Sequence, residues 1–198
     1  MYQVGIQPVL LPMTLCEKEI RALAEVLAGV VFTGGGDITP QYYGQRLICA
    51  DRTEPIRDAF ECLLYREMAL RGKPMLGICR GMQLLAVANG VPLIQNVQGH
   101  ENISHQVAII KSEHLFDICK TRTIAVNSFH RQAVAEPDSH SDIVVCGRAK
   151  DGTIEAIWHR KLPFCLGIQW HPERMCYTSA GSLDVLSAFA WAVGEKGT

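Results

Sequence analysis

The chain has 198 residues, of which 48% are hydrophobic and 20% charged, and its formal net charge is -1. A chain of this length can bury a full core without disulfides or a metal. The near balance of 19 basic and 20 acidic residues argues against a nucleic-acid or anionic-membrane binder. We therefore expect a single domain over residues 1–198, with a small molecule as its partner, no nucleic acid and no membrane.

The eight cysteines do not form a metal-binding or redox pattern, because no C-x-x-C pair occurs among them. The segment 1–12 lacks the basic and long apolar regions of a secretory signal, and no apolar run approaches about 18 residues. These features predict a cytoplasmic protein with reduced thiols.

Strand and helix signals alternate over the first half of the chain, which is typical of βαβ units and a mostly parallel sheet. Thr14 and Glu17 predict a capping box at the start of one helix. The expected strands are 4–11, 30–33 and 75–78. The expected helices are 14–28, an apolar stripe from Ile56 that stops before Gly72, and 82–88.

The second half is rich in strand signals and closes on a helix. Asp151-Gly152 predicts a hairpin turn between two of these strands. The expected strands are 107–110, 123–126, 143–146, 154–158 and 164–169. Apolar residues between 183 and 193 recur at helical spacing and predict the closing amphipathic helix.

The segment Gly77-x-Cys79-x-Gly81 follows an apolar strand and precedes a helix, which is the layout of a nucleophile elbow with cysteine in place of serine. The glycines permit the close contacts of a tight strand-to-helix turn. A cysteine at a helix N-terminus is favoured as the thiolate. The alternative is a small buried core cysteine, but the bracketing glycines favour a nucleophile.

A cysteine nucleophile needs a histidine base with an orienting acceptor. His171 ends an apolar strand, and Glu173 follows across Pro172. Because proline fixes one dihedral, the carboxylate can fold back on the imidazole at little entropic cost. A surface histidine at a strand end is the alternative for His171.

Five motifs in this order resemble the class I glutamine amidotransferase superfamily and, within it, the γ-glutamyl-γ-aminobutyrate hydrolase (peptidase C26) branch. They are Thr-Gly-Gly-Gly-Asp37, Gly-Ile-Cys79-Arg-Gly-Met-Gln83, Asn127-Ser-Phe-His130, Asp151-Gly-Thr-Ile-Glu-Ala156 and Gln169-Trp-His171-Pro-Glu173. The resemblance covers nearly the whole chain. It implies a flavodoxin-like three-layer α/β fold with a mostly parallel central sheet.

The resemblance also implies a Cys79-His171-Glu173 triad that hydrolyses a γ-glutamyl amide through a thioester. The backbone N–H of Arg80, with one from Gly35 or Gly36, would form the oxyanion hole. The resemblance also places Gln83, Ser128 and His130 near the substrate. For Gln83 a solvent-exposed position on the helix surface is an equally weighted alternative.

Further expectations concern Asp37 and the binding of metals or cofactors. Asp37 is expected to cap the loop or a helix rather than touch substrate. His100, His105 and His114 have no recognisable ligand spacing, so we expect no metal, and no cofactor is implied.

Family members usually begin with a strand and a helix for which this sequence shows no counterpart before residue 8. Loss of an internal strand would leave unpaired backbone groups, and such an edge tends to recruit another chain, which leaves a homodimer open.

Three functions therefore stay open. The favoured one is a stand-alone cysteine hydrolase of γ-glutamyl amides. The others are a glutaminase subunit that supplies ammonia to a separate synthetase, and an inactive member retained for binding or regulation.

Overall fold

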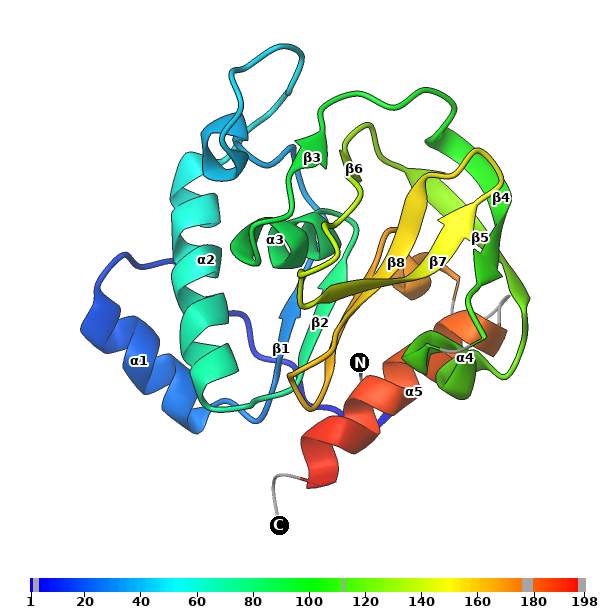
Figure 1. The fold of residues 1–198 in the computed structure, drawn as a ribbon. Coiled ribbons are helices and arrows are strands. Elements are labelled where there is room, and N and C mark those ends of the chain that lie inside the picture. The colour runs from blue at the N-terminus through cyan, green and yellow to red at the C-terminus, as the bar shows by residue number, and fades with distance from the viewer. Residues whose placement is uncertain (2–3, 112, 176–179, 196–198) are drawn as a thin grey trace.

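The computed structural model describes residues 1, 4–111, 113–175 and 180–195 and arranges them as a three-layer α/β domain (Figure 1). The strands are β1 Val30–Phe32, β2 Met75–Ile78, β3 Leu93–Ile94, β4 Glu101–Ile109, β5 Thr123–Phe129, β6 Ala133–Val134, β7 Ile143–Ala149, β8 Ile154–His159 and β9 Cys165–Ile168. The helices are α1 Glu17–Val26, α2 Pro55–Leu70, α3 Arg80–Ala88, α4 His114–Cys119 and α5 Ala180–Glu195, with 3-10 turns at Pro40–Tyr43 and Pro172–Arg174. No helix among the described residues is long and apolar enough to cross a membrane.

The expected α/β class is confirmed, but the expectation of a mostly parallel sheet needs correcting. The main path of the sheet is β1-β2-β9-β8-β7-β4-β5, with β3 and β6 paired beside it. Among the described pairs, only β1 with β2 and β2 with β9 are parallel. The second half is antiparallel because turns rather than crossover helices connect several of its strands, as between β7 and β8.

The sheet separates two hydrophobic cores, and residues of its central strands face one core or the other. Val30 and Phe32 of β1 and Met75 of β2 pack in one core with α1, α2 and α3. Leu76 and Ile78 of β2 pack in the other with α5 and α4. Figure 1 shows α1 and α2 on one side of β1 and β2, and α5 with α4 on the other.

The N-terminal segment differs from the sequence-based expectation. No strand forms over 4–11, because Pro8 and Pro12 cannot donate to a ladder and β2 is the only described strand that pairs with β1. The capping box is also absent. The Thr14 hydroxyl instead accepts from the Cys16 amide at 3.1 Å and donates to Glu19 at 2.5 Å, so α1 begins only at Glu17.

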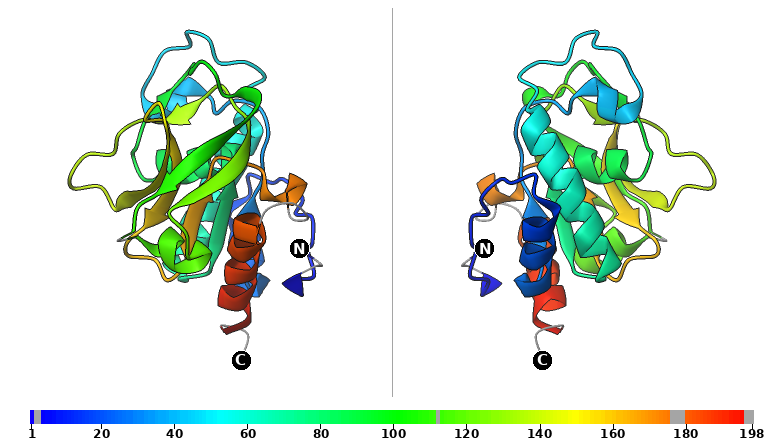
Figure 2. Two further views of the ribbon diagram at one scale, coloured as in Figure 1. Left: turned by 90° about the vertical axis from the view of Figure 1, so that its right-hand side faces the viewer. Right: turned by 90° about the vertical axis from the view of Figure 1, so that its left-hand side faces the viewer.

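The chain between the first 3-10 turn and α2 forms a loop that projects from one end of the molecule in both views of Figure 2. The carboxyl ends of the parallel strands β1 and β2 lead toward this same end (Figure 1). In α/β folds ligands bind at such an edge. The site is therefore sought there.

Candidate active site

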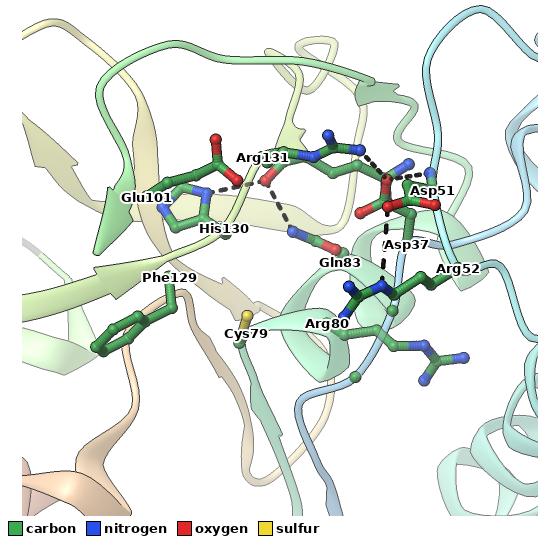
Figure 3. A pocket seen from close by; sticks show the side chains of 13 residues that line it. Asp37, Asp51, Arg52, Cys79, Arg80, Gln83, Glu101, Phe129, His130 and Arg131 are labelled. Carbon is green, nitrogen blue, oxygen red and sulfur yellow. Dashed lines mark hydrogen bonds and ion pairs between the residues drawn. The ribbon is translucent and has the colours of Figure 1, made fainter. Parts of the chain in front are cut away.

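A cavity of about 270 Å³ lies where β1 and β2 end. It is lined by Gly35, Gly36, Asp37, Asp51, Arg52, Cys79, Arg80, Gln83, Glu101, Phe129, His130, Arg131 and Gln132 (Figure 3). Five parts of the chain thus meet at this end of the sheet: the loop after β1, the loop before α2, the β2–α3 junction, the start of β4, and the end of β5 with the residues that follow it. The fold brings several predicted site residues together in this cavity.

Cys79 forms the turn between β2 and α3 and is the N-cap of that helix, with φ 52° and ψ −107°. Such a conformation costs a non-glycine residue on the order of 1–3 kcal/mol and needs surrounding structure to hold it. The Cys79 amide donates to the Ile168 carbonyl at 2.8 Å, which ties the turn to β9. The backbone of Cys79 is therefore fixed at the N-terminus of α3, and Cys79 lines the cavity.

The two glycines around Cys79 are required by close backbone contacts. A Cβ on Gly81 would lie 2.0 Å from the Phe32 carbonyl oxygen, and a Cβ on Gly77 would lie 2.6 Å from the Gly81 backbone. Neither contact can be relieved by a side-chain movement, since both partners are backbone atoms. The elbow thus depends on glycine at both positions.

His171 follows β9, and hydrogen bonds hold both its ring and its backbone. Its Nδ1 lies 2.6 Å from the Glu173 carboxylate. Its backbone is fixed by Asn127, whose Oδ1 accepts from the His171 amide at 2.8 Å and whose Nδ2 donates to the His171 carbonyl at 3.1 Å. Asn127 therefore positions His171. Asn127 belongs to one of the sequence motifs, but the motif did not predict this role.

The ionisation of His171 matches a paired imidazolium. Burial lowers its pKa, but hydrogen bonding and charge interaction with Cys79 and Glu173 outweigh burial and raise the pKa of His171 to about 9. Burial raises the pKa of Glu173, but the hydrogen bond from His171, a backbone hydrogen bond and the charges of His171 and Arg174 together reverse this, so that its pKa lies below the usual range. The ionisation of His171 is therefore coupled to both Cys79 and Glu173.

Gly35 and Gly36, the expected oxyanion-hole glycines, line the cavity together with Cys79. The side chain of Arg57 fixes the loop that leads to them, because its Nη2 donates to the Gly34 and Thr33 carbonyls at 3.1 and 3.0 Å. Arg80 is the first residue of α3, so its amide N–H has no acceptor within the helix. The amide is thus free of helical pairing at the point where the oxyanion hole is expected.

The Arg80 side chain has a separate role that was not predicted from the sequence. It is 1% exposed and forms ion pairs with Asp58 and Glu61 of α2. Glu61 also pairs with Arg57 at 2.8 Å. This buried network connects the elbow helix to α2 and to the loop that carries Gly35 and Gly36.

Gln83 is buried rather than exposed on the helix surface, so that alternative is wrong. Its Nε2 donates to the Gln132 carbonyl at 2.8 Å and to Gln169 Oε1 at 3.2 Å. Gln132 in turn accepts from the Ile38 amide at 2.8 Å. Gln83 lines the cavity, and Gln132 is a wall residue that no sequence pattern singled out.

Ser128 and His130 have different surroundings. His130 is among the residues that line the cavity, whereas Ser128 is not and is fully buried. The Ser128 hydroxyl donates to the His100 carbonyl at 2.8 Å. The structure therefore separates Ser128 from the cavity surface.

Asp37 stabilises a loop and caps no helix. Its Oδ2 accepts from the Asp51 amide at 2.8 Å and lies 3.6 Å from Arg131 Nη2. Burial raises its pKa. The expected capping role is thus found in the loop, and Asp37 also faces the cavity beside Arg131 (Figure 3).

Comparison with known proteins places the chain among relatives of this architecture. The peptidase C26 family model matches residues 1–173. The glutamine amidotransferase-like protein YvdE of Lactococcus lactis is 31% identical, with 94% of this chain and 83% of the relative aligned. Gamma-glutamyl-gamma-aminobutyrate hydrolase PuuD of Escherichia coli is 28% identical, with 85% and 73% aligned.

The fold is also found in solved structures. A proposed GMP synthase subunit from Thermoplasma acidophilum superposes with a TM-score of 0.74 over 98% of this chain and 84% of the other, at 18% identity. At this identity the likeness establishes the fold.

Proposed function

The chain belongs to the peptidase C26 family and is a glutamine amidotransferase-like hydrolase, and from this premise we propose that it cleaves γ-glutamyl amides through a thioester on Cys79. The observation that carries the proposal is the strained Cys79 at the start of α3 in interaction with His171, whose Nδ1 lies 2.6 Å from Glu173. This chemistry needs a nucleophile, a base beside the nucleophile, and an acceptor that orients the base.

The reaction has two halves. Cys79 Sγ attacks the side-chain carbonyl carbon of the glutamyl group, and a C–S bond replaces the C–N bond. His171 carries the proton taken from the Cys79 thiol and donates it to the leaving amine. In the second half His171 removes a proton from water, which attacks the thioester and releases glutamate and the thiol. Glu173 holds the ring and stabilises the imidazolium.

Negative charge on the carbonyl oxygen would be met by the amides of Arg80 and of Gly35 or Gly36. Removal of one such donor costs on the order of 3 kcal/mol in the transition state. The cavity wall also offers both charge signs, from Arg52 and Arg131 and from Glu101. This mixture suits the amino and carboxylate groups of a glutamyl head group, with Gln83 as a further polar contact.

The test is hydrolysis of matched substrates by the purified chain. Gamma-glutamyl-GABA, other γ-glutamyl amines and free glutamine would be compared by glutamate release. We expect γ-glutamyl amines to be cleaved with a higher kcat/KM than glutamine, and Cys79→Ala to abolish turnover. Cys49→Ala is the matched control, because this exposed cysteine lies outside the proposed chemistry.

Two results would contradict the proposal. Preference for glutamine would support a glutaminase subunit that supplies ammonia to a synthetase. Absence of hydrolysis of all the substrates by a folded chain would support an inactive binding member.

A further inference from the structure

Beside the cavity, three histidines from different parts of the chain converge on one buried carboxylate. His100 immediately precedes β4, His105 lies within β4, and His130 follows β5. Glu155, in β8, is fully buried. Its Oε1 lies 3.3 Å from His100 Nδ1, 3.5 Å from His105 Nε2 and 3.4 Å from His130 Nε2.

These short approaches are not accounted for by hydrogen bonds. Among the described residues, neither Glu155 oxygen has a hydrogen-bond partner of good geometry, and His130 Nε2 has none either. A buried carboxylate without such partners is costly. The expected base of the proposed γ-glutamyl hydrolysis is His171, and that proposal gives no role to Glu155, His100 or His105.

The second nitrogens of two of the rings fix their tautomers. His130 Nδ1 lies 2.9 Å from the Gln132 carbonyl oxygen, which can only accept, so Nδ1 carries the proton. His100 Nε2 lies 2.9 Å from Asp151 Oδ2 and donates to it. In their neutral forms both rings therefore direct a lone pair at Glu155 Oε1. Lone pairs directed at an anionic oxygen repel unless a proton or a metal cation lies between them.

This arrangement is that of metal-ligating histidines, which almost always donate their other N–H to a carboxylate or a backbone carbonyl. The spacing also fits. Ligands about 2.0–2.1 Å from a tetrahedral Zn²⁺ are separated by about 3.3 Å, close to the three measured approaches to Oε1. One nitrogen each from His100 and His130 and one oxygen of Glu155 lie mutually within 4.8 Å.

We propose that His100, His130 and Glu155 bind a divalent transition-metal cation, with Zn²⁺ the best match to two imidazoles and a carboxylate. His105 supplies the nearest additional nitrogen. Linear spacing gave no sign of this set, because its members come from separate elements and meet only in the folded sheet. The proposal is independent of the γ-glutamyl hydrolysis proposed above.

The cation would stabilise one wall of the cavity. It would connect the start of β4, the end of β5 and β8, and so hold the His130 ring against the Gln132 carbonyl. That carbonyl also accepts from Gln83 Nε2 at 2.8 Å. We therefore expect the bound cation to raise the thermal stability of the chain.

The test is Zn²⁺ binding by the intact, untagged chain after treatment with a chelator. We expect about one equivalent to bind and to raise the melting temperature. X-ray absorption at the zinc edge, measured on the unmodified chain, should show imidazole and oxygen ligands at about 2.0–2.1 Å. Zinc–sulfur scattering at about 2.3 Å would place the metal on cysteine and overturn the proposal.

Two variants and two controls locate the site. Glu155→Gln should abolish binding. Asp151→Asn changes the partner of His100 at a half-exposed position and keeps an Oδ1 that can accept from the Thr153 amide, so it should fold and weaken Zn²⁺ binding by about 10-fold or more. His140→Ala and Asp142→Asn, which change residues outside the cluster, should bind normally. If Zn²⁺ does not bind, or if Asp151→Asn binds as tightly as the unmodified chain, the proposal is overturned and protons rather than a metal neutralise Glu155.

Discussion

Gly34→Ala should disable the site through a single methyl group. A Cβ on Gly34 would lie 2.8 Å from His171 Cε1, and the next two nearest heavy atoms belong to the same ring at 3.7 Å. Ordinary contact begins at 3.4 Å, so the ring must move by about 0.6 Å or more. Misplacement of a catalytic group by about 1 Å can cost on the order of 10²-fold in rate. We expect a loss in kcat that approaches this size.

The assay is γ-glutamyl amide hydrolysis, with the melting temperature measured on the same preparations. Gly194→Ala is the control, because its added Cβ would have no described atom within 4 Å apart from its chain neighbours and the backbone of its own helix. We expect the control to keep full activity and Gly34→Ala to lose activity with little change in stability. A second readout is the His171 ring signal in NMR spectra, which should shift in Gly34→Ala alone. Unchanged kcat in Gly34→Ala would refute the placement of His171 as the base.

Contacts in the structure support three other predictions. Glu173→Gln should retain part of the activity, with a loss of up to about 10⁴-fold in kcat, and should lower the pKa of His171 from about 9 in an NMR titration. Because the pKa of His171 is raised on folding from about 6.5, its stabilisation is complete below pH ~6.5 and lost as the pH rises through about 9. The difference in unfolding free energy between the unmodified chain and His171→Gln should shrink over that interval, and a constant difference would be inconsistent with the raised pKa. Arg80→Met should destabilise by about 3–5 kcal/mol in chemical denaturation, because it removes the buried cation between Asp58 and Glu61, and only Glu61 keeps an ion pair, with Arg57. Arg148→Met, which removes a more exposed ion pair, should cost less than about 1 kcal/mol.

The elements with strong local patterns could be predicted from the sequence. The buried strand at 75–78 and the hairpin turn at Asp151-Gly152 are found where expected. The strand expected over 4–11 is absent because apolar character alone does not supply a pairing partner. The two-residue strands β3 and β6 are too short to give a periodic signal.

The same difference between local patterns and tertiary contacts applies to the residues of the site. Cys79, His171 and Glu173 stand in local motifs, so these motifs could single them out from the sequence. Asn127, Arg57 and the ion pairs of Arg80 act across the sheet or between helices. Their partners are set by tertiary packing, which no spacing along the chain records.

The most direct test of the account is to trap the proposed intermediate. The chain would be mixed with a γ-glutamyl amide, quenched in acid within one turnover and examined by intact-protein and peptide mass spectrometry. The account predicts one glutamyl group in thioester linkage to Cys79, and none in Cys79→Ala. Turnover that persists in Cys79→Ala, or a glutamyl group carried on any other residue, would contradict it.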